Sequence, residues 1–117
     1  MSRSRASAIL KLGQAAPVFA ALGDRTRLSL VARLCTCGPQ SIVRLTEGAK
    51  VSRQAVTKHL HTLADAGLVR STREGREHIW EIQPKRLSEA RHYLDLISEQ
   101  WDDAIERLRT LVETREH

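Results

Sequence analysis

Aromatic residues are scarce in this chain of 117 residues, which contains one phenylalanine, one tyrosine and two tryptophans. A core with few rings must be built mainly from leucine, valine, isoleucine and alanine, and the length suits a single domain over residues 1–117. No apolar run approaches the roughly 18–20 residues that cross a bilayer, so a membrane partner is not expected. A secretory signal is not expected either, because Lys11, Gln14 and Pro17 interrupt the apolar N-terminal stretch. The sequence therefore predicts a cytoplasmic protein.

The residue patterns of enzymes and of cofactor sites are missing as well. The sequence has no placeable arrangement of serine, histidine and aspartate, no glycine-rich loop that would hold a phosphate, and no nucleophile flanked by a base. It contains two cysteines, and two thiolates fall short of the three or four ligands of a stable metal site. The sequence predicts neither an enzyme nor a bound metal or cofactor.

Negative charge is scarce in the first three quarters of the chain. Residues 1–86 contain 15 Lys/Arg and 6 Asp/Glu, whereas residues 87–117 contain 4 and 8. The whole chain has a formal net charge of +5 and an isoelectric point near 9.9. This asymmetry favours a body that faces nucleic acid and a tail with another role.

Helical periodicity and capping residues predict a mainly α-helical chain with one β-hairpin. The expected N-caps are Asp24, Ser41 and Ser52, and the expected helices include about residues 7–22, 41–47, 53–66 and 87–113. Residues 41–66 have the order of a helix-turn-helix. Residues 68–83 alternate as two strands around a turn at Glu74 and Gly75, and Pro84 is expected to end the second strand.

The last predicted helix has the most regular apolar pattern in the chain. Its apolar residues follow an unbroken alternation of three and four, which is a heptad seam: Leu87, Ala90, Leu94, Ile97, Trp101, Ala104, Leu108 and Leu111. Such a seam can pack on its own domain or pair with a second copy. The large side chain of Trp101 at its centre favours a dimer.

Three stretches of this chain together resemble one family. "ALGDRTRLSLVARL", "VSRQAVTKHLHTLADAGLV" and "REGREHIWEI" occur in the order and spacing of the ArsR/SmtB type of winged helix-turn-helix bacterial repressor, over about residues 16–84. The resemblance implies that the hairpin 68–83 is the wing and that the terminal helices, 7–22 and 87–113, form a homodimer interface. Repression is implied by the resemblance alone. The stretches "RQAVTKHL" and "QWDDAIERLRTLVE" look most like a subgroup without the usual metal-sensing sites.

The helix 53–66 is then expected to read DNA with its polar side. Its inward-facing residues recur at helical spacing: Val56, Leu60 and Leu63. An α-helix fits the major groove of DNA, where Gln54 can pair with adenine and Thr57 can meet a thymine methyl group. Either Arg53 or Lys58 can pair with guanine. The predicted base-reading residues are Arg53, Gln54, Thr57 and Lys58.

Contacts to the DNA backbone are expected beside this helix and on the wing. Four residues are predicted to make them: Ser52, His61, Arg73 and Arg76. Ser52 is first an N-cap, and the two arginines flank Gly75 at the wing tip. His59 lies at the edge of the buried side and is expected to be a hydrogen-bonded packing residue, and His78 is expected to be a neutral strand residue.

The expected partners are double-stranded DNA and a second copy of the chain. A two-fold dimer would bind an inverted repeat whose half-sites lie about one helical turn apart. The predicted interface residues are Phe19, Leu94, Ile97, Trp101 and Leu108. The alternative from a different functional class is a protein-interaction module whose C-terminal heptad helix pairs with a non-identical coil.

Cys35 and Cys37 invite a metal-sensor hypothesis, because many members of the resembled family bind metals through a Cys-X-Cys. Aligned on "RQAVTKHL", however, the family's cysteine positions fall on Ser41 and Val43. The family's other metal site expects aspartate and histidine where this chain has Pro84, Arg86, Ile97 and Gln100. Metal sensing is therefore not expected, and a thiol redox switch at Cys35 and Cys37 is kept as an alternative. No small-molecule effector is inferred.

Overall fold

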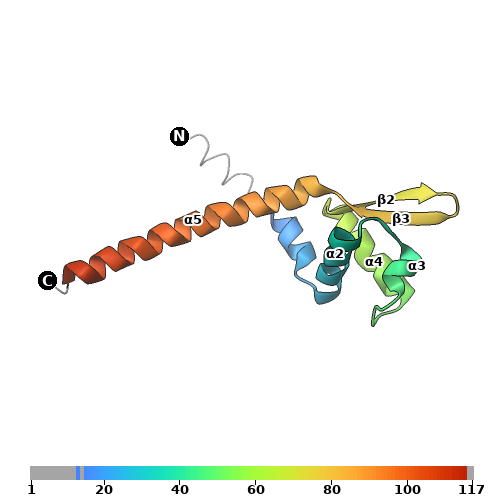
Figure 1. Cartoon of the computed structure of the whole chain (residues 1–117), viewed down its shortest axis with the longest axis horizontal. Helices are drawn as coiled ribbons and strands as arrows, with labels where there is room; N and C mark the ends of the chain where they lie inside the picture. The colour runs from blue at the N-terminus through green and yellow to red at the C-terminus, as the bar shows by residue number, and fades with distance from the viewer. Residues whose placement is uncertain (1–12, 14, 116–117) are drawn as a thin grey trace.

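The computed structural model describes residue 13 and residues 15–115, and it is mainly α-helical with a small antiparallel sheet (Figure 1). A helical segment over residues 15–22 precedes the labelled elements; the predicted helix over 7–22 thus lies partly outside the described residues. The elements that follow are α2 (Arg25–Cys37), β1 (Gln40–Ser41), α3 (Ile42–Thr46), α4 (Arg53–Asp65), β2 (Val69–Glu74), β3 (Glu77–Ile82) and α5 (Pro84–Arg115). The predicted fold class is confirmed.

Side-chain caps start the three short helices, as the sequence predicts. The carboxylate of Asp24 accepts a hydrogen bond from the Arg27 N–H, the hydroxyl of Ser41 from the Arg44 N–H, and the hydroxyl of Ser52 from the Ala55 N–H. Each bond satisfies a backbone donor that the first helical turn leaves free. The caps fix where α2, α3 and α4 begin, and the predicted helix-turn-helix over 41–66 corresponds to α3 and α4.

The cap of α2 makes stability depend on pH in a definite direction. The hydrogen bond from the Arg27 N–H lowers the pKa of Asp24 below 3.8 against a smaller opposing effect of desolvation, and the positive charge of Arg27 adds to the lowering. Because the pKa is lower in the folded state than in the unfolded state, the ionised carboxylate stabilises the fold above about pH 4. This contribution disappears as the pH falls through the folded-state pKa.

Asp24→Asn is therefore expected to lower the melting temperature by a few degrees at pH 7 and by progressively less below pH 4. Asparagine caps a helix as well as aspartate does, so the substitution removes the charge and keeps the cap. Thermal unfolding followed by circular dichroism at pH 7, 4 and 3 measures the difference. A difference that stays constant over this range would contradict the electrostatic account.

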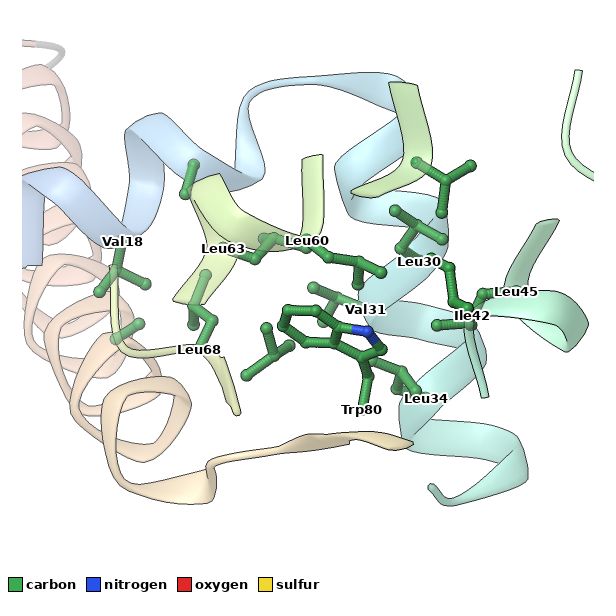
Figure 2. Close-up of a cluster of buried hydrophobic side chains, with 14 residues drawn as sticks. Val18, Leu30, Val31, Leu34, Ile42, Leu45, Leu60, Leu63, Leu68 and Trp80 are labelled. Atoms are coloured by element: carbon green, nitrogen blue, oxygen red, sulfur yellow. The ribbon is translucent and has the colours of Figure 1, made fainter. Parts of the chain in front are cut away.

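The core joins the inner sides of α2, α3 and α4 to the sheet (Figure 2). On α4 the buried residues are Val56, Leu60 and Leu63, each fully buried, which confirms the predicted inward side. Trp80 of β3 fills the space between α4 and α2 and is 5% exposed. Because α4 is anchored along this entire side, its opposite side is held at a fixed orientation on the surface.

The sheet has three strands in the order β1-β3-β2, one more than the hairpin predicted from sequence. Strand β1 has two residues, Gln40 and Ser41, and pairs with Trp80 and Ile79 of β3. The predicted turn position is wrong by one residue: β2 continues through Glu74, and Gly75 and Arg76 form the loop, with Gly75 at φ 63°. A position with such a φ favours glycine, because glycine has no Cβ that would clash with the backbone.

Helix α5 begins earlier than predicted and extends far beyond the body (Figure 1). Pro84 does not simply end the second strand; it is the first residue of α5, a position where the missing N–H costs no helical hydrogen bond. Near its start, α5 packs on the body through Ala90 and Tyr93, which are buried. The remainder projects outward and gives the molecule extents of 71 × 32 × 20 Å. None of the described helices is long and apolar enough to cross a membrane.

Candidate nucleic-acid interface

An arginine that the sequence analysis did not single out fixes the turn between α3 and α4. Arg33 of α2 donates from its guanidinium to the carbonyl oxygens of Glu47 at 2.8 Å and Leu45 at 3.3 Å, and also to that of Arg44. These carbonyls lie at the C-terminal end of α3, where helical acceptors lack partners. The guanidinium thereby holds α3 and the following turn on α2. Arg33 lies 11 to 14 positions before the residues whose carbonyls it binds, so no local pattern in the sequence indicates this contact.

The outer side of α4 carries the predicted base-reading residues, which we call the reading face: Arg53, Gln54, Thr57 and Lys58. Arg53, Gln54 and Lys58 are exposed, whereas Thr57 is half-buried at the edge. The Thr57 hydroxyl donates to the Arg53 carbonyl at 2.9 Å. With its hydroxyl engaged, Thr57 contributes chiefly its methyl group to the surface. The reading face thus combines an amide, two cationic groups and a small apolar group.

A polar junction holds the middle of α4 against the start of α2. The Nδ1 atom of His59 lies 3.3 Å from the Nη1 atom of Arg27 and 3.9 Å from the Oδ2 atom of Asp24. Arg27 also donates from Nε to the Ala21 carbonyl at 2.7 Å, at the end of the preceding helical segment. His59 is half-buried and hydrogen-bonded, as predicted. It orients α4 from behind the reading face.

Two of the four predicted backbone-contact residues, Ser52 and His61, flank the reading face along α4. Ser52 is exposed at the start of α4, where its oxygen accepts from Ala55 and its hydroxyl proton stays free to donate. His61 is exposed, and its ring lies edge-on to Trp80 with 5.6 Å between the ring centroids. Through this contact His61 also connects α4 to the hairpin.

The β2–β3 hairpin, the wing, carries exposed cationic groups to its tip. Arg73 donates from Nε to the Gly75 carbonyl at 3.3 Å, which leaves its two terminal nitrogens free. Arg76 lies in the loop itself and is exposed. Arg70, nearer the body, instead pairs with Glu81 across the hairpin. Two arginines of the wing are therefore available at the tip, and a third is neutralised within the hairpin.

The cysteines cannot form a disulfide with each other in this helix. Cys35 and Cys37 are free and exposed in the last turn of α2. Residues two apart on an α-helix point about 200° away from each other, so their sulfur atoms diverge. A redox role for Cys35 and Cys37 stays a prediction. Within the part of the chain that the structure describes, no group of three or more metal-ligating side chains comes together.

The predicted interface residues of α5 form an uncovered apolar strip. Leu94, Ile97, Trp101 and Leu108 are 50% to 67% exposed, so none of them is buried on its own body. Three further exposed residues widen the strip toward the end of α5: Ile105, Leu111 and Val112. Ile105 and Val112 were not predicted, because they lie outside the strict heptad positions. Phe19 is half-buried and packs against the core. We call these seven exposed apolar residues of α5 the apolar seam.

Comparison of the sequence with known proteins gives matches to a family model and to individual relatives. A family model described as a helix-turn-helix domain matches residues 22–72. The chain is 30% identical over 79 residues to the uncharacterized HTH-type transcriptional regulator MJ1325 of Methanocaldococcus jannaschii, covering 68% of this chain and 89% of that protein.

Solved structures agree with these matches. An ArsR-like transcriptional regulator from Rhodococcus sp. RHA1 is similar with a TM-score of 0.73 and 34% identity, covering 86% of this chain and 94% of that chain. The fold is also shared with a winged helix-turn-helix DNA-binding domain from Mycobacterium bovis, described as homodimeric, at a TM-score of 0.61 and 24% identity over 81% of this chain and 84% of that one.

Proposed function

The chain belongs to the ArsR-like family of winged helix-turn-helix transcriptional regulators, and we propose that it is a dimeric, sequence-specific DNA-binding repressor. The observation that carries the proposal is the reading face of α4. The opposite side of this helix is fully buried at Val56, Leu60 and Leu63, while Arg53, Gln54 and Lys58 are exposed. A helix anchored in this way presents the same polar side chains to any partner, with the wing beside it.

The chemistry of the reading face suits the edges of DNA bases in the major groove. The Gln54 amide offers a donor and an acceptor and can pair with adenine, while Arg53 or Lys58 can donate to the two acceptors of guanine. The Thr57 methyl group fits against a thymine methyl group, because its hydroxyl is already bonded to the Arg53 carbonyl. These residues would supply sequence discrimination.

Contacts to phosphates would supply affinity and the register of the protein on the duplex. The free hydroxyl proton of Ser52 and the first N–H groups of α4 can bind a phosphate at one end of the reading face. Arg73 and Arg76 can bind phosphates from the wing, and His61 can bind one from α4, beside its contact with Trp80. None of these groups would distinguish one base from another.

Dimerisation through the apolar seam supplies the symmetry that the proposal requires. The seam is exposed in the single chain, and the fold is shared with a domain that is described as homodimeric. A second copy would cover the seam, with Trp101 as the central anchor and Phe19 at the edge. Two α4 helices related by a two-fold axis would then enter successive major grooves of an inverted repeat, about one helical turn apart.

Selection of bound duplexes from a random DNA pool tests this function. The reduced protein is used at near-physiological salt, because the ionic contribution to affinity falls steeply with salt. Enrichment of an inverted repeat with half-sites about 10 base pairs apart is the expected result. No enrichment by a folded, dimeric protein would contradict base reading by α4.

Arg73→Ala is expected to weaken binding to the selected site and to random DNA by the same factor. The loss of one phosphate contact should flatten the slope of log K against log salt by about 0.9 per protomer. Fluorescence anisotropy at several salt concentrations measures both quantities. Arg70→Ala is the matched control, since this arginine of the same wing is paired with Glu81 and its loss should change the slope little. An unequal loss on the two DNAs would assign Arg73 to base reading.

A further inference from the structure

The register of the wing places a histidine directly opposite Arg73. In the β2–β3 pairing, Arg73 faces His78, and both side chains are exposed. Side chains of directly paired residues project from the same face of the sheet. That face continues toward the body as Val69, Trp80 and Ile82, which are buried or half-buried. Arg73 and His78 therefore lie on the body-facing side of the wing, beyond the end of the core.

The opposite face of the wing carries the other sign of charge. Glu74 faces Glu77 in the last pair before the loop, and both carboxylates are exposed. The tip thus has a cationic and protonatable side, with Arg73 and His78, and an anionic side, with Glu74 and Glu77. A polyanion is attracted by the first side and repelled by the second.

Helix α4 lies beside the cationic side. His61 of α4 contacts Trp80 edge-on, and Trp80 is two residues from His78 on the same face of β3. The row His61, Trp80, His78 and Arg73 therefore runs from α4 out along the wing. Helix α4 and the wing lie next to each other (Figure 1). A DNA strand whose bases meet the reading face would therefore run close to the side of the wing that faces α4.

We propose that Arg73 and His78 together form a proton-dependent phosphate-binding pair on the body-facing side of the wing, so that DNA binding takes up a proton at His78. The inference rests on the proposed DNA-binding function and adds a residue and a pH dependence to it. His78 acts here as a direct phosphate ligand and is more than a neutral strand residue. Glu74 and Glu77 help to orient the wing by keeping their face away from the DNA.

The physical basis is the mutual repulsion of two like charges across a strand pair. Protonated His78 and Arg73 repel each other in the free protein, and like charges placed directly opposite are destabilising. A phosphate between them removes the repulsion and accepts charge-assisted hydrogen bonds from both side chains. The Arg73 Nε is held by the Gly75 carbonyl, which leaves the terminal nitrogens for this role.

Three charged or titratable groups bear on His78. Arg73 faces it from β2, Arg76 lies in the adjoining loop, and His61 of α4 contacts Trp80, two residues further along β3. Glu77 is adjacent in sequence but projects from the other face, together with Glu74. An imidazole ordinarily changes charge between about pH 5 and 8, so the test compares binding at pH 6 and pH 8.

The experiment measures the salt dependence of binding to the selected duplex at pH 8 and at pH 6. For the unmodified protein, the slope of log K against log salt is expected to be steeper by about 0.9 per protomer at pH 6, because one more cation contacts a phosphate. Affinity at 0.15 M salt should rise roughly fivefold for each protomer that binds, which follows from a slope difference of about 0.9 when the two lines meet near 1 M salt. His78→Gln should abolish the part of this change that comes from His78.

His92→Gln is the matched control, because His92 is an exposed histidine on α5, far from the wing. It should keep the full pH effect. His61→Gln separates any contribution of the second histidine on the same side. If His78→Gln retains the pH effect of the unmodified protein, the inference is wrong and the proposed function stands. If the unmodified protein selects no DNA at either pH, the proposed function itself fails.

Discussion

Replacing Trp101 by alanine is expected to raise the dissociation constant of the dimer by roughly 30- to 1,000-fold, equivalent to about 2–4 kcal/mol. Trp101 is 67% exposed at the centre of the apolar seam, so the part of the chain that the structure describes leaves most of this side chain uncovered. In a dimer this ring would be buried by the partner, and large aromatic side chains at interface centres contribute most of the binding energy. The free monomer should keep its helical content, because an exposed helical tryptophan contributes little to the fold.

Analytical ultracentrifugation over a range of concentrations measures this effect. Asp102→Ala is the matched control, because Asp102 is the next residue of α5, is exposed and lies outside the apolar seam. The control should dimerise like the unmodified protein. Unchanged dimerisation of the Trp101→Ala variant would show that the apolar seam does not form the dimer interface. An unmodified protein that is monomeric would favour the alternative in which α5 pairs with a non-identical helix.

The starts of α2, α3 and α4 could be predicted because each depends on residues close in sequence. Asp24, Ser41 and Ser52 cap the helices that they were expected to cap, and the inward side of α4 follows from its helical spacing. The capping side chain and the backbone N–H that donates to it are three residues apart, so no knowledge of the tertiary structure is needed. Strand β1 had no such signal: its two residues are extended because they pair with Trp80 and Ile79, which lie about 40 positions later.

The candidate site was predictable where it depends on one helix and not where it depends on strand register. The reading face needs only the periodicity of α4. The pairing of Arg73 with His78 needs the loop at Gly75 and Arg76. The expected turn at Glu74 and Gly75 would have placed Arg73 opposite Arg76, because moving a hairpin loop by one residue changes every pair by two. His78 therefore looked like an isolated strand residue until the register was known.

Gln54→Ala is expected to weaken binding to the selected site by roughly 10- to 100-fold, about 1–3 kcal/mol, while random DNA is bound within about twofold of the unmodified protein. Gln54 is exposed on the reading face in the first turn of α4, and its amide can pair bidentately with adenine. Alanine is the best helix former, so the substitution removes the amide and preserves the helix. The slope of log K against log salt should not change, because the amide carries no charge.

Parallel titrations of the selected duplex and of a scrambled duplex measure this loss of discrimination, and a repeated selection with the variant should lose base preference at one position in each half-site. Thr62→Ala is the matched control: Thr62 is exposed on the same helix, and its hydroxyl is bonded to the Lys58 carbonyl at 3.1 Å. It lies eight residues, or about 12 Å, further along the helix axis than Gln54. If Gln54→Ala weakens binding to both duplexes equally, Gln54 holds the protein on the DNA without reading a base, and discrimination must come from Arg53, Thr57 or Lys58.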